Sequence, residues 1–174
     1  MLNSQLAKIT NDDFDFLSKN GKRSSVFMDY DFESLIYSEW GLLKFDLPDL
    51  FASGNFEQLL YLLLKDRGIN FFLNDIQKQP INKIIEFILW IKDELETIKE
   101  LEKTYLSSEP SAKMFQSGIN KLDQFGIMNT VDNLARGDIL KYELIKKQKY
   151  NVIFDKQYRE VITNEIQNKL VKLK

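Results

Sequence analysis

PINKIIEFILWIKDELETIKELEKTYL, residues 80–106, decides the fold of this chain. Proline suits the first turn of a helix, and neither proline nor glycine interrupts the residues that follow it. Apolar residues recur at spacings of three and four from Ile84 through Leu95 to Ile98, which predicts one long amphipathic helix. Bulky residues around Trp90 widen the apolar stripe, so we expect the first half to be buried on most sides and the second half on one side.

The polar face of this helix carries charges at intervals of three. Glu96 with Lys99, and Glu100 with Lys103, are spaced to form ion pairs on a solvent-exposed helix surface. Each pair is expected to stabilise the helix by about a few tenths of a kcal/mol. This interpretation assigns the four side chains to solvent.

Shorter helical patterns flank residues 80–106 on both sides. Gly41 and Gly68 stand where helices over 32–40 and 56–67 should end, and Asn55 is placed to cap the second of these helices. Later helices are expected over about 110–124, 129–136 and 139–147, and from about 151 onward. The sequence therefore predicts an all-α fold, with six to seven helices around a long central helix (80–106).

Residues 1–30 lack a clear helical pattern. Asn20-Gly21 is a strong turn signal, and it lies between FDFL at 14–17 and SVFMDY at 25–30. We expect this segment to be irregular, or to form a small hairpin in which those two stretches pair. No internal repeat is visible, so the chain 1–174 is expected to be a single helical domain.

The composition excludes several kinds of active site. The 174 residues include no cysteine and no histidine, which removes thiolate nucleophiles, the usual zinc ligands and the side chain most used for acid–base catalysis near neutral pH. The acidic run at 12–15 lacks the central glycine and final glutamate of a calcium-binding loop, and the one at 29–33 is explained by the dipole of a following helix. Glycine-rich phosphate loops are also missing. We expect a protein that is not an enzyme and needs no metal or cofactor.

Charge is distributed unevenly along the chain. The net charge is −2, yet residues 141–174 hold nine Lys or Arg and only four Asp or Glu. Tyr142, Tyr150 and Tyr158 are interleaved with these cations, in a segment whose pattern fits a basic amphipathic helix. Such a surface suits nucleic acid, so a nucleic-acid-binding accessory protein is the alternative function. We favour a simpler interpretation, a solvated helix face above a core made from the same aromatic residues.

Two segments are candidates for binding a partner protein through a helix face: the central helix and residues 141–174. The strongest apolar run, 84–91, is far too short to span a bilayer, so no membrane partner is expected. The residues predicted to contact a partner are Trp90, Leu95, Ile98, Tyr142, Lys146, Lys147, Lys149, Tyr150, Phe154 and Tyr158.

Three strings in the second half carry a resemblance: LDQFG at 122–126, LARGDILKY at 134–142 and KYNVIF at 149–154. Together they resemble the C-terminal part of small proteins from tail or head–tail morphogenesis clusters of tailed bacteriophages, over about residues 101–170. The resemblance implies a tail assembly chaperone-like factor, which would bind a tape-measure protein, or a small virion connector. It implies other phage structural proteins or the chain itself as partners, and the host cytoplasm or the virion as location.

Overall fold

The computed structural model describes residues 17, 19–107 and 119–173, so most of the predicted strand at 14–17 and much of the predicted helix at 110–124 lie outside it. In chain order its strands and α-helices are β1 (Val26–Phe27), β2 (Tyr30–Asp31), α3 (Leu47–Ala52), α4 (Phe56–Asp66), α5 (Leu73–Gln77), α6 (Ile81–Tyr105), α8 (Met128–Ala135), α9 (Tyr142–Lys146) and α10 (Tyr150–Lys172). The 3₁₀ segments are η1 (Leu35–Tyr37), η3 (Ile119–Phe125) and η4 (Ile139–Lys141), and η2 (Leu42–Asp46) is a π-helical segment. The predicted all-α fold, with a small irregular or hairpin N-terminal part, is confirmed.

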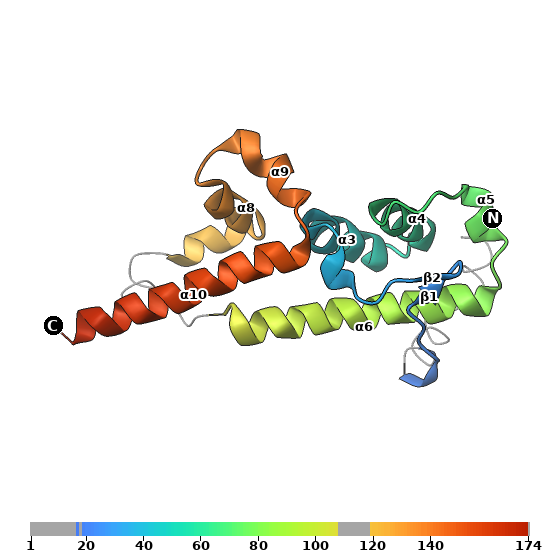
Figure 1. Ribbon diagram of the computed structural model, residues 1–174, viewed down its shortest axis with the longest axis horizontal. Helices are drawn as coiled ribbons and strands as arrows, with labels where there is room; N and C mark the ends of the chain where they lie inside the picture. The colour runs from blue at the N-terminus through green and yellow to red at the C-terminus, as the bar shows by residue number, and fades with distance from the viewer. Residues whose placement is uncertain (1–16, 18, 108–118, 174) are drawn as a thin grey trace.

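The long helix α6 is the axis of the molecule (Figure 1). The hairpin, α4 and α5 lie along its N-terminal half, and α3 lies near its middle. The C-terminal helix α10 runs beside the end of α6 and continues past it, with α8 and α9 drawn above α10 in Figure 1. The predicted span 80–106 is confirmed, with Pro80 as the residue that precedes the first helical position.

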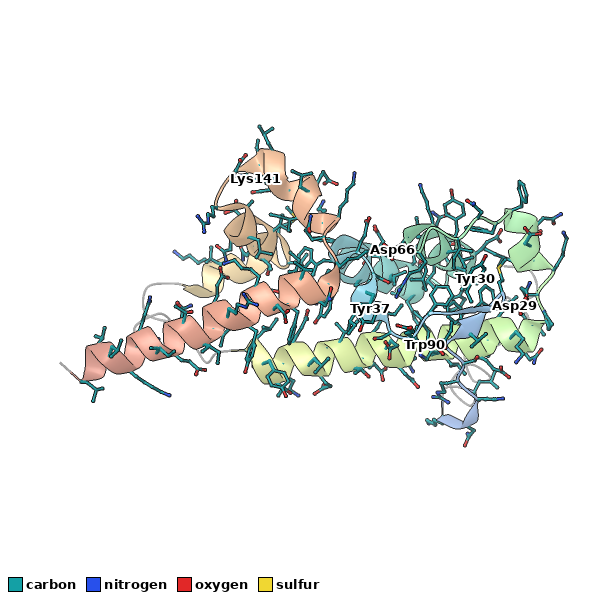
Figure 2. All side chains as sticks on the ribbon, viewed as in Figure 1. Asp29, Tyr30, Tyr37, Asp66, Trp90 and Lys141 are labelled. Carbon is teal, nitrogen blue, oxygen red and sulfur yellow. The ribbon has the colours of Figure 1, made fainter. Side chains whose placement is uncertain are left out.

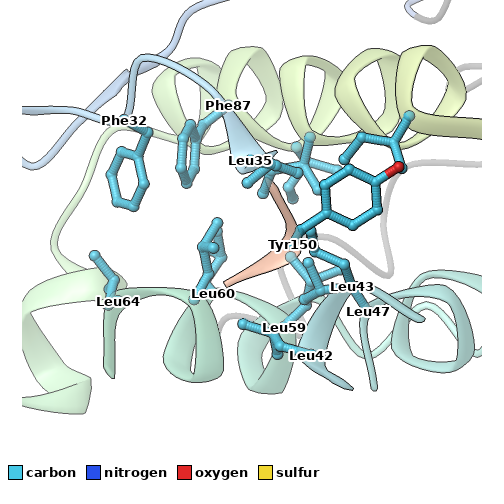
Figure 3. Close-up of a cluster of buried hydrophobic side chains, with 14 of the residues drawn as sticks. Phe32, Leu35, Leu42, Leu43, Leu47, Leu59, Leu60, Leu64, Phe87 and Tyr150 are labelled. Carbon is cyan, nitrogen blue, oxygen red and sulfur yellow. The ribbon is translucent and has the colours of Figure 1, made fainter. Parts of the chain in front are cut away.

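A leucine-rich core holds η2, α3 and α4 against the first half of α6 (Figure 3). The Phe87 ring of α6 is fully buried and stacks on Phe27, with ring centroids 4.8 Å apart. Tyr150, the first residue of α10, belongs to the same cluster. Burying each large apolar side chain contributes about 1.5–3 kcal/mol, so this core attaches the start of α10 to the first half of α6.

The predicted helix over 32–40 is wrong, although Phe32 and Trp40 are buried as the pattern required. The Trp40 N–H donates to the Gln148 carbonyl at 2.7 Å, and the Tyr150 N–H donates to the Ser38 carbonyl at 2.9 Å. These two bonds form an antiparallel backbone bridge between the two segments. Pairing with distant residues has therefore replaced the local helix, leaving only the single turn η1.

Gly41 does not end a helix, contrary to the prediction. Its backbone is right-handed helical, with φ −61° and ψ −43°, and it leads directly into η2. A Cβ atom at Gly41 would lie 2.7 Å from the Lys146 Cβ and 3.0 Å from the Lys146 carbonyl oxygen. Glycine is needed here because the end of α9 packs directly against the backbone.

Replacing Gly41 with alanine is expected to destabilise the protein by about 1–3 kcal/mol, the usual cost of forcing extra atoms into a packed site. Helix propensity alone predicts the opposite sign, a gain of up to about 1 kcal/mol. Urea unfolding of the native and Gly41→Ala proteins measures the difference. A variant as stable as the native chain would mean that Lys146 yields freely to the added methyl group.

The N-terminal hairpin forms at a different place from the one predicted. The stretch 25–30 was expected to form one strand. Instead, β1 lies within that stretch and pairs with β2, which spans its last residue and the next one. The turn residues Met28 and Asp29 have φ values of 52° and 65°. Left-handed backbone at both positions matches the twist of a two-residue hairpin, so the turn signal at Asn20-Gly21 does not mark the hairpin.

Several predicted helix ends are confirmed. The Asn55 side chain accepts a hydrogen bond from the Gln58 N–H at the start of α4, and Gly68 follows that helix with φ 67°. The Asp138 carboxylate accepts from the Leu140 N–H at 3.1 Å, as a cap should. The single helix expected over 139–147 is instead divided into η4 and α9.

Candidate partner-binding groove

The second half of α6 has one face that the core leaves uncovered. Beside this face, η2 and α3 form a wall, and the hollow between wall and helix has a volume of about 510 Å³. Apolar side chains, among them Leu43, Phe51 and Leu95, make up most of its lining, and Lys44, Lys92 and Lys99 border it. A concave apolar surface with a cationic border is suited to an amphipathic, negatively charged ligand.

A second hollow, of about 500 Å³, lies further along α6. Its opposite wall includes Ile127, at the start of α8, and Gln157 of α10. Lys44 and Lys99 line both hollows, so the two lie next to each other along α6, with the ion pair between Lys44 and Glu102 beside both. We call the two hollows together the α6 groove. The residues of α6 and its end that line the groove are Lys92, Leu95, Glu96, Ile98, Lys99, Glu102, Lys103, Leu106 and Ser107.

The lining residues of α6 recur at spacings of three and four, so they lie on one face of the helix. From Lys92 to Leu106 this face extends about 21 Å, at 1.5 Å per residue. A partner helix of about four turns would match that length. The lined face of α6 therefore has the length of a four-turn helix.

Lysines outnumber glutamates along the α6 groove. Its lining contains four lysines, at 44, 92, 99 and 103, and two glutamates, at 96 and 102. Lys44 forms a half-buried ion pair with Glu102, and Lys92 lies 4.0 Å from Glu96. Lys99 is exposed, lines both hollows and forms no ion pair within the described residues. The groove is thus net positive on a chain whose net charge is −2.

The structure brings two of the three partner-binding residues predicted on α6 into this groove. Leu95 is half-buried and lines it, and Ile98 lies at its floor with only 4% of its surface exposed. Trp90 does not line it. The Trp90 ring stacks on Phe87 at 5.4 Å, so this residue is part of the packing between α6 and the N-terminal segment.

Most of the residues predicted around the basic segment have partners within the molecule. The Tyr142 hydroxyl donates to the Asp132 carboxylate at 2.5 Å. Lys146 pairs with Glu143 at 2.9 Å, and Lys149 pairs with Asp66 at 3.2 Å. Only Lys147, of the three predicted lysines, is exposed without an ion pair in the described part of the chain.

Tyr150 is a core residue, which corrects its assignment to a binding surface. Only 2% of it is exposed. Burial raises the pKa of the Tyr150 hydroxyl, and the nearby Glu102 carboxylate raises it further. A ring held in this way cannot stack on a nucleic-acid base unless α10 detaches.

Phe154 and Tyr158 form a short aromatic ladder with the end of α6. Tyr105 meets Phe154 at 6.3 Å and Tyr158 at 5.6 Å between ring centroids, both edge to face. Such pairs stabilise packing by about 0.5–1.5 kcal/mol each. The two residues predicted as partner contacts therefore join α10 to α6, with Tyr158 remaining 37% exposed.

Two charged residues of the described chain, Asp66 and Arg67, stabilise the backbone bridge between residues 38–40 and 148–150. Asp66, whose side chain is only 4% exposed, accepts from the Glu39 N–H at 3.2 Å and from Lys149. The neighbouring Arg67 donates to the Ser34 carbonyl at 2.6 Å, and burial lowers the pKa of its guanidinium while Asp66 opposes that shift. These charges hold separate segments together, which is a structural role. In Figure 2, Asp66 is seen well away from the C-terminal end of α10.

The described residues contain no group of three or more acidic side chains arranged to hold a metal ion. The Asp31 carboxylate of the predicted acidic run accepts from the Ser25 hydroxyl and the Glu33 N–H, which also lowers its pKa. That run therefore shapes a turn. Within the same described ranges, no helix combines the length and the apolar character needed to cross a bilayer.

The two lysines that matter most to the groove could not be identified from the sequence pattern. Lys99 was expected to pair with Glu96, but Glu96 approaches Lys92 instead. Lys44 comes from η2, and only the tertiary fold brings it to α6. Comparison of the chain with protein-family models, curated proteins and solved structures gives no match in any of the three.

Proposed function

We propose that this protein is a non-enzymatic binding module whose α6 groove holds an acidic amphipathic helix of a partner protein. The observation that supports the proposal is the pair of adjacent hollows along about 21 Å of α6, the first lined mostly by apolar side chains, together with their net positive lining. A helix in such a groove buries its apolar stripe on residues such as Leu95, while its carboxylates face the lysines. Charge complementarity of this kind selects partners and speeds their association.

The setting that we propose is bacteriophage morphogenesis. The strings at 122–126, 134–142 and 149–154 resemble small tail or head–tail morphogenesis proteins, and a tape-measure protein offers long helices to bind. In that setting the chain acts in the host cytoplasm as a tail assembly chaperone-like factor, or remains in the virion as a small connector. The absence of cysteine and histidine is consistent with a role that needs no chemistry.

Co-expression with the tape-measure protein of the phage genome that encodes the chain tests this setting. We expect the two proteins to elute together in size-exclusion chromatography, with the complex weakened when salt is raised from about 50 to 500 mM, because exposed charges are then screened. Mass spectrometry of purified particles distinguishes the chaperone role from the connector role, since only a connector stays in the virion. Failure to bind the tape-measure protein, together with absence from particles, would refute the phage setting.

The alternative, nucleic-acid binding through residues 141–174, receives no support from the positions of Tyr142, Tyr150, Lys146 and Lys149. Filter binding with labelled DNA and RNA at low salt distinguishes it from our proposal. We expect no retention above that of an unrelated acidic protein.

A further inference from the structure

Beyond Tyr158, α10 leaves the rest of the molecule. From Arg159 to Leu173 every described side chain is exposed except that of Val161, which is half-buried. Figure 2 shows this end of α10 projecting away from the other described elements. A helical segment of about 15 residues is marginally stable alone in water, so the exposed half of α10 needs a surface to pack on.

An apolar stripe runs along this exposed half. Ile162, Ile166 and Leu170 are 38%, 54% and 56% exposed, and Leu173 is 83% exposed. Residues four apart on a helix differ by about 40° around the axis, and residues three apart by about 60° in the other direction, so these four side chains share one side. We call them the α10 stripe.

We infer that the α10 stripe is covered by the same stripe of a second copy of this chain, running antiparallel, with Ile166 opposite Ile166 across a two-fold axis. Residue 166 is the midpoint of the exposed segment 159–173. In this register the two exposed segments, as far as the structure describes them, overlap over their full length. The stripe is then self-complementary, as a two-fold interface requires.

Charges beside the stripe select the antiparallel orientation. Glu165 and Lys169 are exposed, lie on the same flank of the stripe, and form no ion pair with any described residue. An antiparallel two-fold axis places that flank of one helix beside the same flank of the other, so Glu165 meets Lys169 of the second copy on both sides of Ile166. A parallel pair would instead place that flank beside the opposite flank of the second copy, where the uncharged Thr163 and Gln167 lie, so neither charge would gain a partner.

The second copy does not suit the α6 groove. Residues 159–174 hold four basic and two acidic residues, and a positive helix is repelled by the positive border of that groove. Self-pairing is therefore a separate property from the proposed function. The overlap of about 22 Å between two single helices is smaller than a standard interface of about 800 Å² per partner, so we expect a dimer that dissociates on dilution.

Disulfide trapping in the full chain tests the register, because the native sequence has no cysteine. The variants Ile162→Cys, Ile166→Cys and Leu170→Cys are made singly, checked for unchanged helical content by circular dichroism, and oxidised. We expect Ile166→Cys to link to itself. Ile162→Cys and Leu170→Cys should each stay monomeric alone, since equal residues then lie about 12 Å apart along the axis, yet should link to each other when mixed.

Two results would overturn the inference. Self-linking of Ile162→Cys as efficient as that of Ile166→Cys would indicate parallel pairing. No linking in any combination, with native protein that sediments as a monomer at every concentration, would rule out self-pairing. In either case the binding of an acidic helix in the α6 groove is measured separately, because none of the three positions lines that groove.

Discussion

Replacing Tyr150 with alanine is expected to lower the free energy of unfolding by about 3–5 kcal/mol, the range found when a buried aromatic side chain is truncated. Tyr150 is 2% exposed and packs in the core at the first turn of α10. Its N–H also donates to the Ser38 carbonyl in the backbone bridge. The substitution leaves a cavity where α10 attaches to the rest of the protein, and urea unfolding followed by circular dichroism measures the loss.

Tyr158→Ala is the matched control, since it makes the same change on the same helix. Tyr158 is 37% exposed, so we expect less than half the loss seen at Tyr150. The nucleic-acid hypothesis predicts a different outcome, in which Tyr150→Ala weakens DNA or RNA retention with little change in stability. A loss below about 1 kcal/mol at Tyr150 would contradict its place in the core.

The long helix was predictable because the signals that define it are local. Pro80 marks its start, and the apolar spacing continues without a helix breaker, so the predicted span 80–106 differs from α6 by one residue at each end. The segment 32–40 shows the limit of such signals. Its apolar residues are buried as expected, but the backbone pairs with residues 148–150, and spacing along the chain carries no information about a partner so distant.

The groove was predictable only in part, for the same reason. Leu95 and Ile98 belong to the apolar stripe and were found from it. The spacing of Lys99 from Glu96 predicted an ordinary surface ion pair. Its position beside two hollows depends on the tertiary fold, which places η2 and α8 next to α6. Tyr150 was misjudged because an aromatic residue among lysines has the same pattern in a core as on a surface.

Reversing two groove lysines, Lys99→Glu with Lys103→Glu, is expected to weaken binding of an acidic helix about 10- to 30-fold. Each reversal removes an attraction and adds a repulsion, each worth about 0.2–1 kcal/mol for exposed charges. Both side chains are exposed, so the fold should be preserved. The probe is a fluorescein-labelled designed peptide of about four helical turns, with leucine at helical spacing on one face and glutamate on the other, titrated by anisotropy.

Lys78→Glu with Lys83→Glu is the control for net charge. These lysines lie at the end of α5 and the start of α6, outside the groove, with 67% and 51% of their side chains exposed. The control changes the total charge by the same amount but leaves the groove intact. It should therefore weaken binding of the peptide by less than about threefold at moderate salt, where distant charges are screened. Equal losses in the two double variants would assign the effect to overall charge instead of to the groove.

The most direct test of a basic helix-binding groove compares two peptides on the native protein. The first is the acidic probe, and the second is the same peptide with every glutamate replaced by lysine, so that helix length and apolar face are unchanged. We expect the acidic peptide to bind at least about tenfold more tightly at low salt, and we expect it alone to protect α6 amides between Lys92 and Leu106 from hydrogen exchange. Equal affinity for both peptides, or protection elsewhere in the chain, would contradict the proposal.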